Sequence, residues 1–432
     1  MNYHVGIDLG STTTKAVILN EEGSPLGRGI TNSRSNYDVA CQIVLSEALI
    51  NTRFSLVASE LDRTGMEELR KQKLLAELGR RFRLQQYLGQ LGVLEDELGR
   101  LLLRLNPSGK FLPSVQRILR KMAGEAEELF ADGAARKSDF FRDLAGSRYL
   151  QLAEEEARDN NAVSFDHLVG LSDKAILEVE SSPSASGSFE SHAAEARAGM
   201  TEPDGHLDKA LSRIIDVELK QVGSVGTGYG RARLPFPDGQ VRSEILCHGL
   251  GAHAMFPSTR TVLDIGGQDT KAIQVDEQGI VTSFQMNDRC AAGCGRYLGY
   301  IADEMNLGVH ELGPIARNAD RPARINSTCT VFAGAELRER LSLGEKRENI
   351  LAGLHRAIIL RAMSLLARSG GVKSEFTFTG GVAKNPAAVD ALGTLITENY
   401  GDLKINISPD SIYTGAYGAA LFALRDAKRA GN

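Results

Sequence analysis

A glycine-rich strand–turn–strand segment occurs twice in this chain, and this duplication constrains the fold more than any other feature. The copy that ends at Gly23 reappears without a gap as the copy that ends at Gly279, an offset of 256 residues. Seven of the sixteen positions from Asp8 to Gly23 are identical in the second copy. Each copy has an apolar strand, a polar turn and a second strand, which predicts a β-hairpin. The repeat predicts two similar lobes that face each other across a cleft.

The tips of both predicted hairpins contain the residue types that bind phosphate. Glycine lets backbone N–H groups approach an anion closely, and hydroxyl groups add further donors. One such turn usually only reverses the chain, but two copies in register favour two loops around one triphosphate. The predicted phosphate-binding residues are Gly10, Ser11, Thr12, Thr13, Lys15, Gly266, Gly267 and Lys271. Asp8 and Asp264 are predicted to lie beside the accompanying metal ion, and Gln268 or Asp269 to orient the attacking water.

A third glycine-rich segment lies near the C-terminal end of the sequence, in FTFTGGVAKNP. It predicts a buried strand, a turn, and a helix with Asn385 as N-cap and Pro386 as its first residue. The glycine pair permits the flat approach of a nucleoside, although an ordinary strand-to-helix turn has the same pattern. The predicted adenosine-binding residues are Gly380, Gly381, Lys384 and Asn385. The dinucleotide fingerprint and the P-loop are both absent from the sequence.

Two cysteines that follow the second hairpin are candidate metal ligands. Cys290 lies where a helix is expected to begin, capped by the preceding polar residues, and Cys329 lies 39 residues further on, before another predicted helix. Two thiolates do not complete a site that needs four ligands. Spacing leaves three interpretations: a zinc site that adds Cys294 and Cys247 or His248, a 4Fe-4S cluster held by two chains, or unligated thiols.

Five sequence blocks resemble known ATPases. GIDLGSTTTK, DIGGQDTK and FTGGVAKNP resemble the phosphate-1, phosphate-2 and adenosine motifs of the actin/sugar-kinase/heat-shock superfamily. With NDRCAAGCGRYL and CTVFAGAEL, they closely resemble the ATPases that activate 2-hydroxyacyl-CoA dehydratases and those of benzoyl-CoA reductase. The resemblance implies an α/β fold of duplicated ribonuclease H-like domains with a large helical insertion. It also implies ATP, Mg²⁺ and a 4Fe-4S cluster shared between two subunits, with Cys290 and Cys329 as ligands.

The resemblance also suggests how the chain is divided, because the short dehydratase activators lack a stretch that is present here. That stretch has apolar residues at three- and four-residue spacing, which predicts helices. The expected segments are 1–50 (first part of the N-terminal ATPase subdomain), 51–205 (mainly helical insertion), 206–260 (remainder of that subdomain) and 261–432 (C-terminal ATPase subdomain with the cluster cysteines). The insertion and the phrase GRGITNSRSNYDVA resemble the larger ATP-binding subunit of benzoyl-CoA reductase.

By this resemblance, the chain couples ATP hydrolysis to low-potential electron transfer from the cluster to a CoA-thioester reductase, with benzoyl-CoA reductase as the first assignment. The expected partners are a shorter homologous ATPase subunit or a second copy of the chain, thioester-binding reductase subunits and a reduced ferredoxin-like donor. The main alternative is a homodimeric activator of a 2-hydroxyacyl-CoA dehydratase. A sugar kinase would need a carboxylate base beside a sugar pocket, and a chaperone-like or filament-forming ATPase would need a substrate domain or an assembly surface.

Composition excludes some function classes. Lys and Arg number 50 against 55 Asp and Glu, and the resulting net charge of −5 argues against a nucleic-acid surface. The sequence starts without a basic head and apolar stretch, and it lacks an apolar run long enough to span a bilayer. Five cysteines is an odd number, which argues against a disulfide framework. We therefore expect a cytoplasmic protein that binds neither nucleic acid nor membrane.

Overall fold

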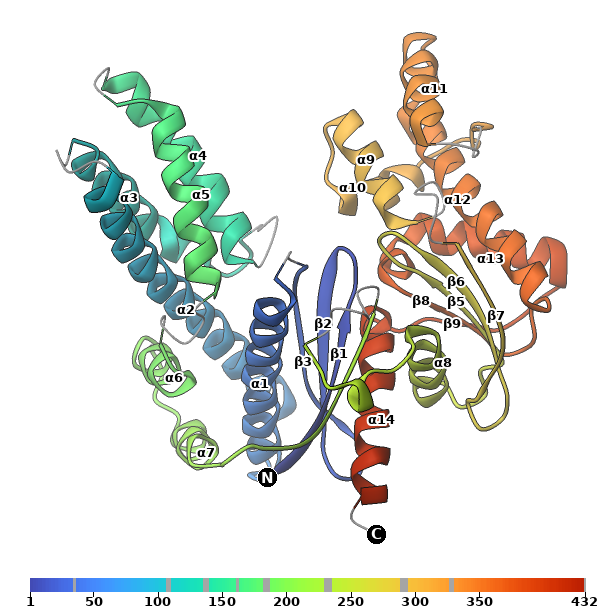
Figure 1. The fold of residues 1–432 in the computed structure, drawn as a ribbon, viewed down its shortest axis with the longest axis horizontal. Coiled ribbons are helices and arrows are strands. Elements are labelled where there is room, and N and C mark those ends of the chain that lie inside the picture. Colours follow the sequence, from blue (N-terminus) through green and yellow to red (C-terminus); the bar gives the residue numbers. More distant parts are fainter. Residues whose placement is uncertain are drawn as a thin grey trace. The chain divides into compact units, whose positions relative to one another are not determined.

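The computed structural model describes residues 1–33, 36–105, 110–134, 140–160, 163–181, 187–228, 235–287, 294–325 and 330–430. The chain divides into two compact units, which are described separately (Figure 1). One unit comprises Leu45–Glu218 together with Met1, and the other comprises Asn2–Val44 and Leu219–Asn432. We call them the helical unit and the ATPase unit.

The ATPase unit contains two sheets of the same topology. The first has the order β3-β2-β1-β4 and the second the order β7-β6-β5-β8-β9. In both, three antiparallel strands are followed by a strand that pairs in parallel with the first one. The strands are β1 (Asn2–Leu9), β2 (Thr13–Leu19), β3 (Pro25–Asn32), β4 (Lys220–Gly228), β5 (Thr261–Ile265), β6 (Thr270–Val275), β7 (Val281–Asn287), β8 (Phe376–Thr379) and β9 (Ile405–Asn406). The repeated topology confirms the two hairpins that the sequence predicted.

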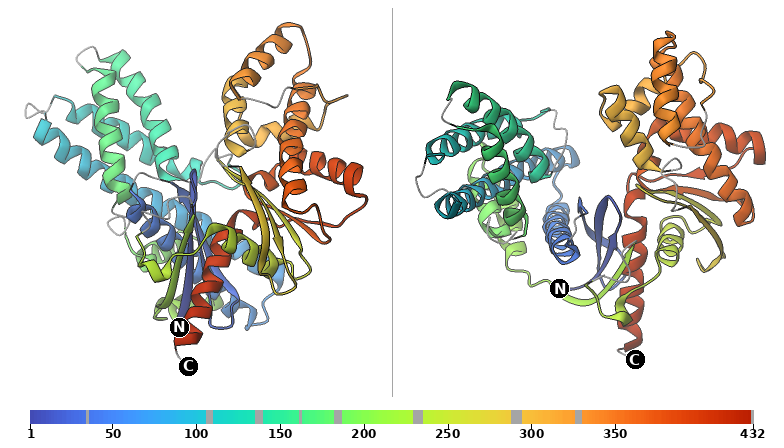
Figure 2. Two further views of the ribbon diagram at one scale, coloured as in Figure 1. Left: turned by 45° about the vertical axis from the view of Figure 1, so that its right-hand side comes forward. Right: turned by 45° about the horizontal axis from the view of Figure 1, so that its top comes forward.

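Helices α8 (Glu244–Met255) and α14 (Thr414–Ala430) pack against each other and against the sheets. Glycines allow this close approach, because a Cβ atom at Gly418 would lie 1.8 Å from Cys247 O and one at Gly251 would lie 2.1 Å from Thr414 O. A Cβ atom at Gly6 would lie 2.1 Å from Ala416 O, so α14 lies directly on β1 (Figure 2). The first turns of both helices lie near the ends of β1 and β5, which are the first strands of the two sheets.

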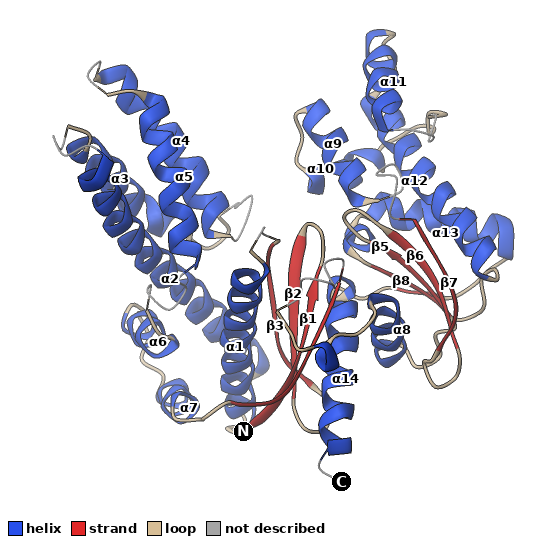
Figure 3. Cartoon of the chain, in the orientation of Figure 1, coloured by secondary structure: helices blue, strands red, loops and turns tan. Residues whose placement is uncertain are grey.

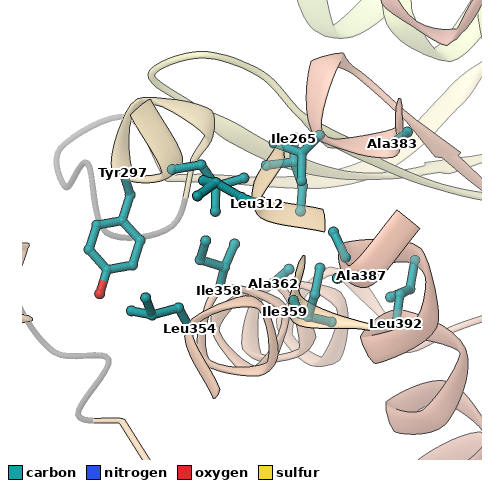
Figure 4. Packing of buried hydrophobic residues seen from close by; sticks show 14 of the residues in the cluster. Ile265, Tyr297, Leu312, Leu354, Ile358, Ile359, Ala362, Ala383, Ala387 and Leu392 are labelled. Atoms are coloured by element: carbon teal, nitrogen blue, oxygen red, sulfur yellow. The ribbon is translucent and has the colours of Figure 1, made fainter. Parts of the chain in front are cut away.

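We call the parts of the ATPase unit built on the first and on the second sheet the first and the second lobe. The core of the second lobe lies between its sheet and five helices (Figure 4). They are α9 (Gly295–Met305), α10 (Val309–Ala316), α11 (Thr330–Ser342), α12 (Arg347–Ser369) and α13 (Pro386–Tyr400). Ile358 of α12 is 1% exposed and belongs to the same cluster as Leu312 and Leu392. Among the described residues, only α12 is long and apolar enough to cross a membrane, but 67% of its most apolar stretch is buried inside the protein. Burial on this scale is typical of a core helix.

All elements of the helical unit in the described residues are helices (Figure 3). They are α1 (Tyr37–Asp62), which starts in the ATPase unit, and α2 (Glu68–Leu105), α3 (Leu112–Leu129), α4 (Phe141–Asp159), α5 (Phe165–Ser181), α6 (Phe189–Ala198) and α7 (Gly205–Ile215). The long helix α2 contributes to two hydrophobic clusters, one with α3, α4 and α5 and one with α1, α6 and α7. Because α1 is continuous from Tyr37 to Asp62, the expected boundary at residue 50 falls inside a helix.

Candidate functional site

The tips of the two hairpins lie against each other. In the first hairpin Asp8 is opposite Lys15, and in the second Asp264 is opposite Lys271. The two copies of the repeat therefore pair their strands in the same register. A Cβ atom at Gly267 would lie 2.5 Å from Thr12 Oγ1, which only glycine permits without a shift of Thr12. The predicted phosphate loops of both lobes therefore meet at one place, as a two-sided phosphate site requires.

A buried histidine stands between the two aspartates. Asp8 and Asp264 are 5% and 1% exposed, and His248 of α8 is 6% exposed. His248 Nε2 lies 3.9 Å from Asp8 Oδ2, and His248 Nδ1 lies 3.3 Å from Asp264 Oδ1. Burial alone would lower the pKa of His248, but the Asp264 carboxylate outweighs it, so the pKa is raised. The sequence had favoured a core position near the cleft for His248 and offered it as a zinc ligand, and neither interpretation anticipated contact with both aspartates.

Asp264 is held ionised by its surroundings. Burial alone would raise the pKa of its carboxyl group, but the charges of His248 and Lys271 and a hydrogen bond from Thr379 hold it far below its usual range. Thr379 Oγ1 donates this hydrogen bond over 2.8 Å from the end of β8. The parallel register places Thr379 opposite Asp264, just as it places Thr227 opposite Asp8 in the first lobe.

The loss of this hydrogen bond is expected to be measurable. Thr379→Val should lower the free energy of unfolding by about 1–3 kcal/mol, because the substitution leaves a buried carboxylate without one of its donors. Urea unfolding followed by circular dichroism measures this difference. Thr201→Val makes the same change at an exposed position whose side chain has no hydrogen bond within the described residues, and this matched control is expected to change little. Equal effects of the two substitutions would contradict the role of Thr379.

The two lysines of the repeat differ in their surroundings. Lys271 is 3% exposed, and its Nζ lies 2.7 Å from Asp269 Oδ2 and 3.5 Å from Asp264 Oδ2. Burial would lower the pKa of Lys271, but the charges of these carboxylates raise it. The lysine is therefore held as an ammonium ion whose charge the two carboxylates balance. In the first copy Thr13 replaces Asp269, and Lys15 has no ion pair within the described part of the chain. Lys15, whose Nζ lies 3.1 Å from the Cβ position of Gly10, is therefore the lysine that is available to a phosphate.

Glu244 is a buried carboxylate near the loops that was not among the predicted site residues. This residue is in the first turn of α8 and is only 6% exposed. Burial raises the pKa of its carboxyl group, and the charges of Lys271, Asp269, His248 and Asp8 also act on it. Gln268 and Asp269 are half-buried at the tip of the second hairpin. Nothing in the sequence near α8 signals that Glu244 and His248 lie beside the loops, because the packing of α8 brings them there.

The predicted adenosine segment forms the expected turn and helix. Gly380 has φ +87°, and a Cβ atom there would lie 2.3 Å from Ile265 O, so glycine is required. Gly381, by contrast, has open space around its Cβ position. Asn385 Oδ1 accepts hydrogen bonds from the N–H groups of the second and third residues of α13, which confirms the predicted N-cap and Pro386 as first helical residue. Lys384 is exposed at the end of the short 3₁₀ helix η5 (Gly381–Lys384).

The start of α9 corrects one prediction. The sequence placed a helix start near Cys290, capped by Asn287 or Asp288. In the structure Asn287 is the last residue of β7, where it pairs with Thr270, and α9 begins at Gly295 with Cys294 in the N-cap position. Pairing in the sheet therefore takes Asn287 away from a capping role. Cys290 and Asp288 lie outside the described residues, as does Cys329.

The first turn of α9 is bonded directly to the second phosphate loop. Gly295 N donates to Gly266 O over 2.8 Å, and Arg296 N donates to Gly267 O over 2.7 Å. A Cβ atom at Gly295 would lie 3.0 Å from Gly266 O and 3.4 Å from Val382 Cγ2 of the adenosine segment. The helix therefore starts in contact with two of the three predicted nucleotide-binding segments.

Helices α9 and α11 run in the same direction. Arg338 Nη1 lies 2.5 Å from Glu304 Oε2, and a Cβ atom at Gly334 would lie 2.3 Å from the Tyr300 hydroxyl oxygen. In each pair the α11 residue is 34 positions after the α9 residue, so the first turns of the two helices are at the same end. In sequence, Cys329 immediately precedes α11 and Cys290 precedes α9 by five residues.

The described residues contain no group of three or more His, Cys, Asp or Glu arranged to hold a metal ion. Cys247 is fully buried, and burial raises the pKa of its thiol to about 12. Cys294 is also buried, at 1% exposure. The zinc interpretation depends on Cys290 and Cys329 as well, which lie outside the described residues.

The fold is shared with a solved structure. The activator of 2-hydroxyisocaproyl-CoA dehydratase from Clostridium difficile, solved with bound ADPNP, superposes with a TM-score of 0.56 at 23% identity, covering 99% of this chain and 97% of that one. The duplicated sheets and facing loops thus define the actin/sugar-kinase/heat-shock ATPase fold, with a large helical insertion. Residues 5–423 match the BadF/BadG/BcrA/BcrD ATPase family, and the chain belongs to this family.

The relatives change the finer assignment made from the sequence. The activator of lactoyl-CoA dehydratase from Anaerotignum propionicum is 40% identical over 233 residues, which cover 54% of this chain and 86% of the relative. One of the benzoyl-CoA reductase subunits from Thauera aromatica is 34% identical over 219 residues, which cover 51% of this chain and 76% of the relative. The chain is thus more similar to a dehydratase activator than to this reductase subunit, and the comparisons support the alternative interpretation better than the first one.

Proposed function

We propose that the chain is an activator ATPase that uses ATP hydrolysis to drive an electron from a 4Fe-4S cluster to a 2-hydroxyacyl-CoA dehydratase. The observation that carries the proposal is the pair of hydrogen bonds between the second phosphate loop and the first turn of α9, the helix that follows Cys290. The similarity to the lactoyl-CoA dehydratase activator supports the choice of acceptor. A CoA-thioester reductase of the benzoyl-CoA type is the second candidate acceptor, because the Thauera aromatica protein is also a relative.

The nucleotide part of the proposal assigns roles to the described residues. The triphosphate lies between the two hairpin tips, with Gly10, Gly266 and Gly267 exposing backbone N–H groups and Ser11, Thr12 and Thr13 adding hydroxyls. Lys15 provides the available positive charge. Gln268 or Asp269 orients the attacking water, and Glu244 is a further carboxylate beside it. Positioning and charge neutralisation suffice for phosphoryl transfer, so no covalent nucleophile is needed.

Mg²⁺ fits the donor set at this place. Asp8 and Asp264 are buried carboxylates, one from each lobe, and both face His248. Carboxylate oxygens are the protein ligands that Mg²⁺ prefers, and the ion neutralises phosphate charge when it is bound. In the proposal these two aspartates hold the ion, directly or through water. Lys271 keeps Asp264 ionised and in place.

The cluster part of the proposal rests on the family resemblance and on the two helices. The first turns of α9 and α11 are at the same end. Cys329 immediately precedes α11, where the helix dipole stabilises a thiolate, and Cys290 precedes α9 by five residues. Each chain supplies two of the four thiolates that a 4Fe-4S cluster needs, so a second copy or a homologous ATPase subunit supplies the others. When bound, the cluster carries the electron. A ferredoxin-like protein is the proposed donor.

The coupling between the two parts is mechanical. If the lobes close on ATP, the second loop moves, and the carbonyl groups of Gly266 and Gly267 pull on the N–H groups of α9. The loop and the helix are closely packed at this contact, because the Cβ position of Gly295 is only 3.0 Å from Gly266 O. A shift of α9 would change the dipoles and hydrogen bonds that this helix offers to a bound cluster, and such groups set a cluster's reduction potential.

The test is anaerobic purification with iron, sulfide and native-mass analysis of the wild type and two variants. We expect four irons per pair of ATPase chains in the wild type, and loss of iron and of electron transfer with retained ATPase in Cys290→Ala. Cys41→Ala changes a buried thiol of α1 and is the matched control, with iron retained. Wild-type protein without iron, or a single chain that holds a complete metal site, would contradict the shared cluster. Only the ATPase part of the proposal would then remain.

A further inference from the structure

The ATPase unit contains a second concave site that none of the proposed nucleotide residues line. It is a cavity of about 300 Å³ between β2, β3, the end of α8 and the segment that leads from β9 into α14. Its lining residues are Val17, Pro25, Arg28, Met255, Phe256, Ser408, Asp410, Tyr413 and Tyr417. A volume of about 300 Å³ is at the lower end for small-molecule sites, which limits an occupant to one or two rings.

The apolar part of the lining is aromatic. Phe256, Tyr413 and Tyr417 are all half-buried, as is Met255 beside them. Three half-buried aromatic side chains that face one cavity offer ring faces and edges to an occupant, and aromatic pairs in offset or edge-to-face geometry stabilise each other beyond simple burial. This lining favours a planar aromatic ring over a flexible aliphatic chain.

The polar part of the lining is electrically balanced. Arg28 Nη2 lies 2.8 Å from Asp410 Oδ2, so the two charged groups among the described lining residues neutralise each other. Burial raises the pKa of Tyr417, so its phenol is neutral. Within the described residues the Tyr417 hydroxyl makes no hydrogen bond, which leaves it available to one polar atom of an occupant. The lining therefore favours a neutral molecule with a single hydrogen-bonding group.

One wall of the cavity is shared with the nucleotide site. The 3₁₀ helix η6 (Ser411–Tyr413) accepts a hydrogen bond at Ser411 O from Gly380 N over 3.2 Å. Ser411 Oγ also donates to Gly380 O over 3.4 Å. At Gly415, in the first turn of α14, a Cβ atom would lie 2.8 Å from Asp8 Oδ2. The segment that carries Tyr413 and Tyr417 into the cavity thus also touches the adenosine segment and a proposed magnesium residue.

We propose that this cavity binds a small neutral aromatic molecule with one hydrogen-bonding group, and that its occupancy is coupled to nucleotide binding. An occupant that fixes Tyr413 and Tyr417 also fixes the backbone that contacts Gly380 and Asp8. Coupling of this kind is reciprocal, so ATP changes the affinity of the occupant by the factor by which the occupant changes the affinity of ATP.

The binding test uses p-cresol as the probe and the full chain as the protein. We expect saturation-transfer NMR signals from p-cresol, and none from 4-methylcyclohexanol, which has a similar size but a saturated, non-planar ring. Ser408→Phe places a ring in the cavity and should abolish the p-cresol signal, whereas Ser283→Phe, on exposed β7, should keep it. Tyr417→Phe should weaken binding about five-fold, as expected for one lost hydrogen bond. Circular dichroism confirms that each variant is folded.

The coupling test compares the dissociation constant of p-cresol with and without saturating ADPNP. We expect the two values to differ by at least about three-fold, with the same factor in the affinity of ADPNP when p-cresol is varied. A signal from the saturated alcohol equal to that of p-cresol overturns the aromatic class. Binding that persists in Ser408→Phe overturns the location, and a dissociation constant that ADPNP does not change overturns the coupling.

Discussion

Asp264→Asn is expected to lower the ATPase rate by at least about 100-fold, because it removes a preorganised charge from the proposed site of the phosphates and the metal ion. Asparagine has nearly the same size as aspartate. The neighbouring Lys271 retains its ion pair with Asp269, whose Oδ2 lies 2.7 Å from Lys271 Nζ. The fold is therefore expected to persist while hydrolysis fails. Phosphate release at saturating Mg-ATP measures the rate, and urea unfolding confirms that the variant is folded.

Asp402→Asn is the control for this substitution. Asp402 is exposed and has no ion pair or side-chain hydrogen bond within the described residues, so the same loss of charge should leave the rate unchanged. Asp8→Asn should resemble Asp264→Asn, since the two aspartates occupy the same place in the repeat. A folded Asp264→Asn protein with a near wild-type rate would show that the ion and the phosphates are bound elsewhere.

Gly295→Ala is expected to separate ATP hydrolysis from its effect on the cluster. The added methyl group lies 3.0 Å from Gly266 O, so α9 and the second loop must move apart by a few tenths of an ångström. A misplacement of about 1 Å can cost about 100-fold in rate, and for this smaller shift we expect ATP-dependent electron transfer to fall by about ten-fold. ATPase activity should fall much less. Electron paramagnetic resonance of the reduced cluster should lose its change on addition of ADPNP.

Gly299→Ala is the matched control on the same helix. Apart from the backbone of its own helix, no atom of the described residues lies within 4 Å of the Cβ position at Gly299, so the methyl group there meets open space. Because alanine favours a helix over glycine by about 1 kcal/mol, Gly299→Ala should stabilise α9 without affecting the coupling. Loss of coupling in both variants would point to helix propensity rather than to the contact with the loop. Full coupling in Gly295→Ala would refute the mechanical link.

Much of the local structure could be predicted from the sequence. The two hairpins follow from a repeated pattern of apolar strands and glycine-rich turns, and the structure has both, with Asp8 and Asp264 in matching registers. The cap of α13 follows from Asn385 and Pro386, whose local chemistry is sufficient to start a helix. The start of α9 could not be predicted in the same way, because Asn287, an apparent capping residue, pairs with Thr270 and is the last residue of β7.

By itself, the sequence determined the duplicated hairpins, the turn and helix cap of the third glycine-rich segment, and the family. These depend on short segments whose residue types act on their own neighbours. Only the tertiary structure decided that His248 stands between the two aspartates and that, within the described residues, Lys271 is neutralised while Lys15 is not. It also decided that α9 begins on the second loop. The physical reason is that Coulomb and hydrogen-bond energies depend on distances between atoms, and for residues far apart in the chain these distances are set by packing.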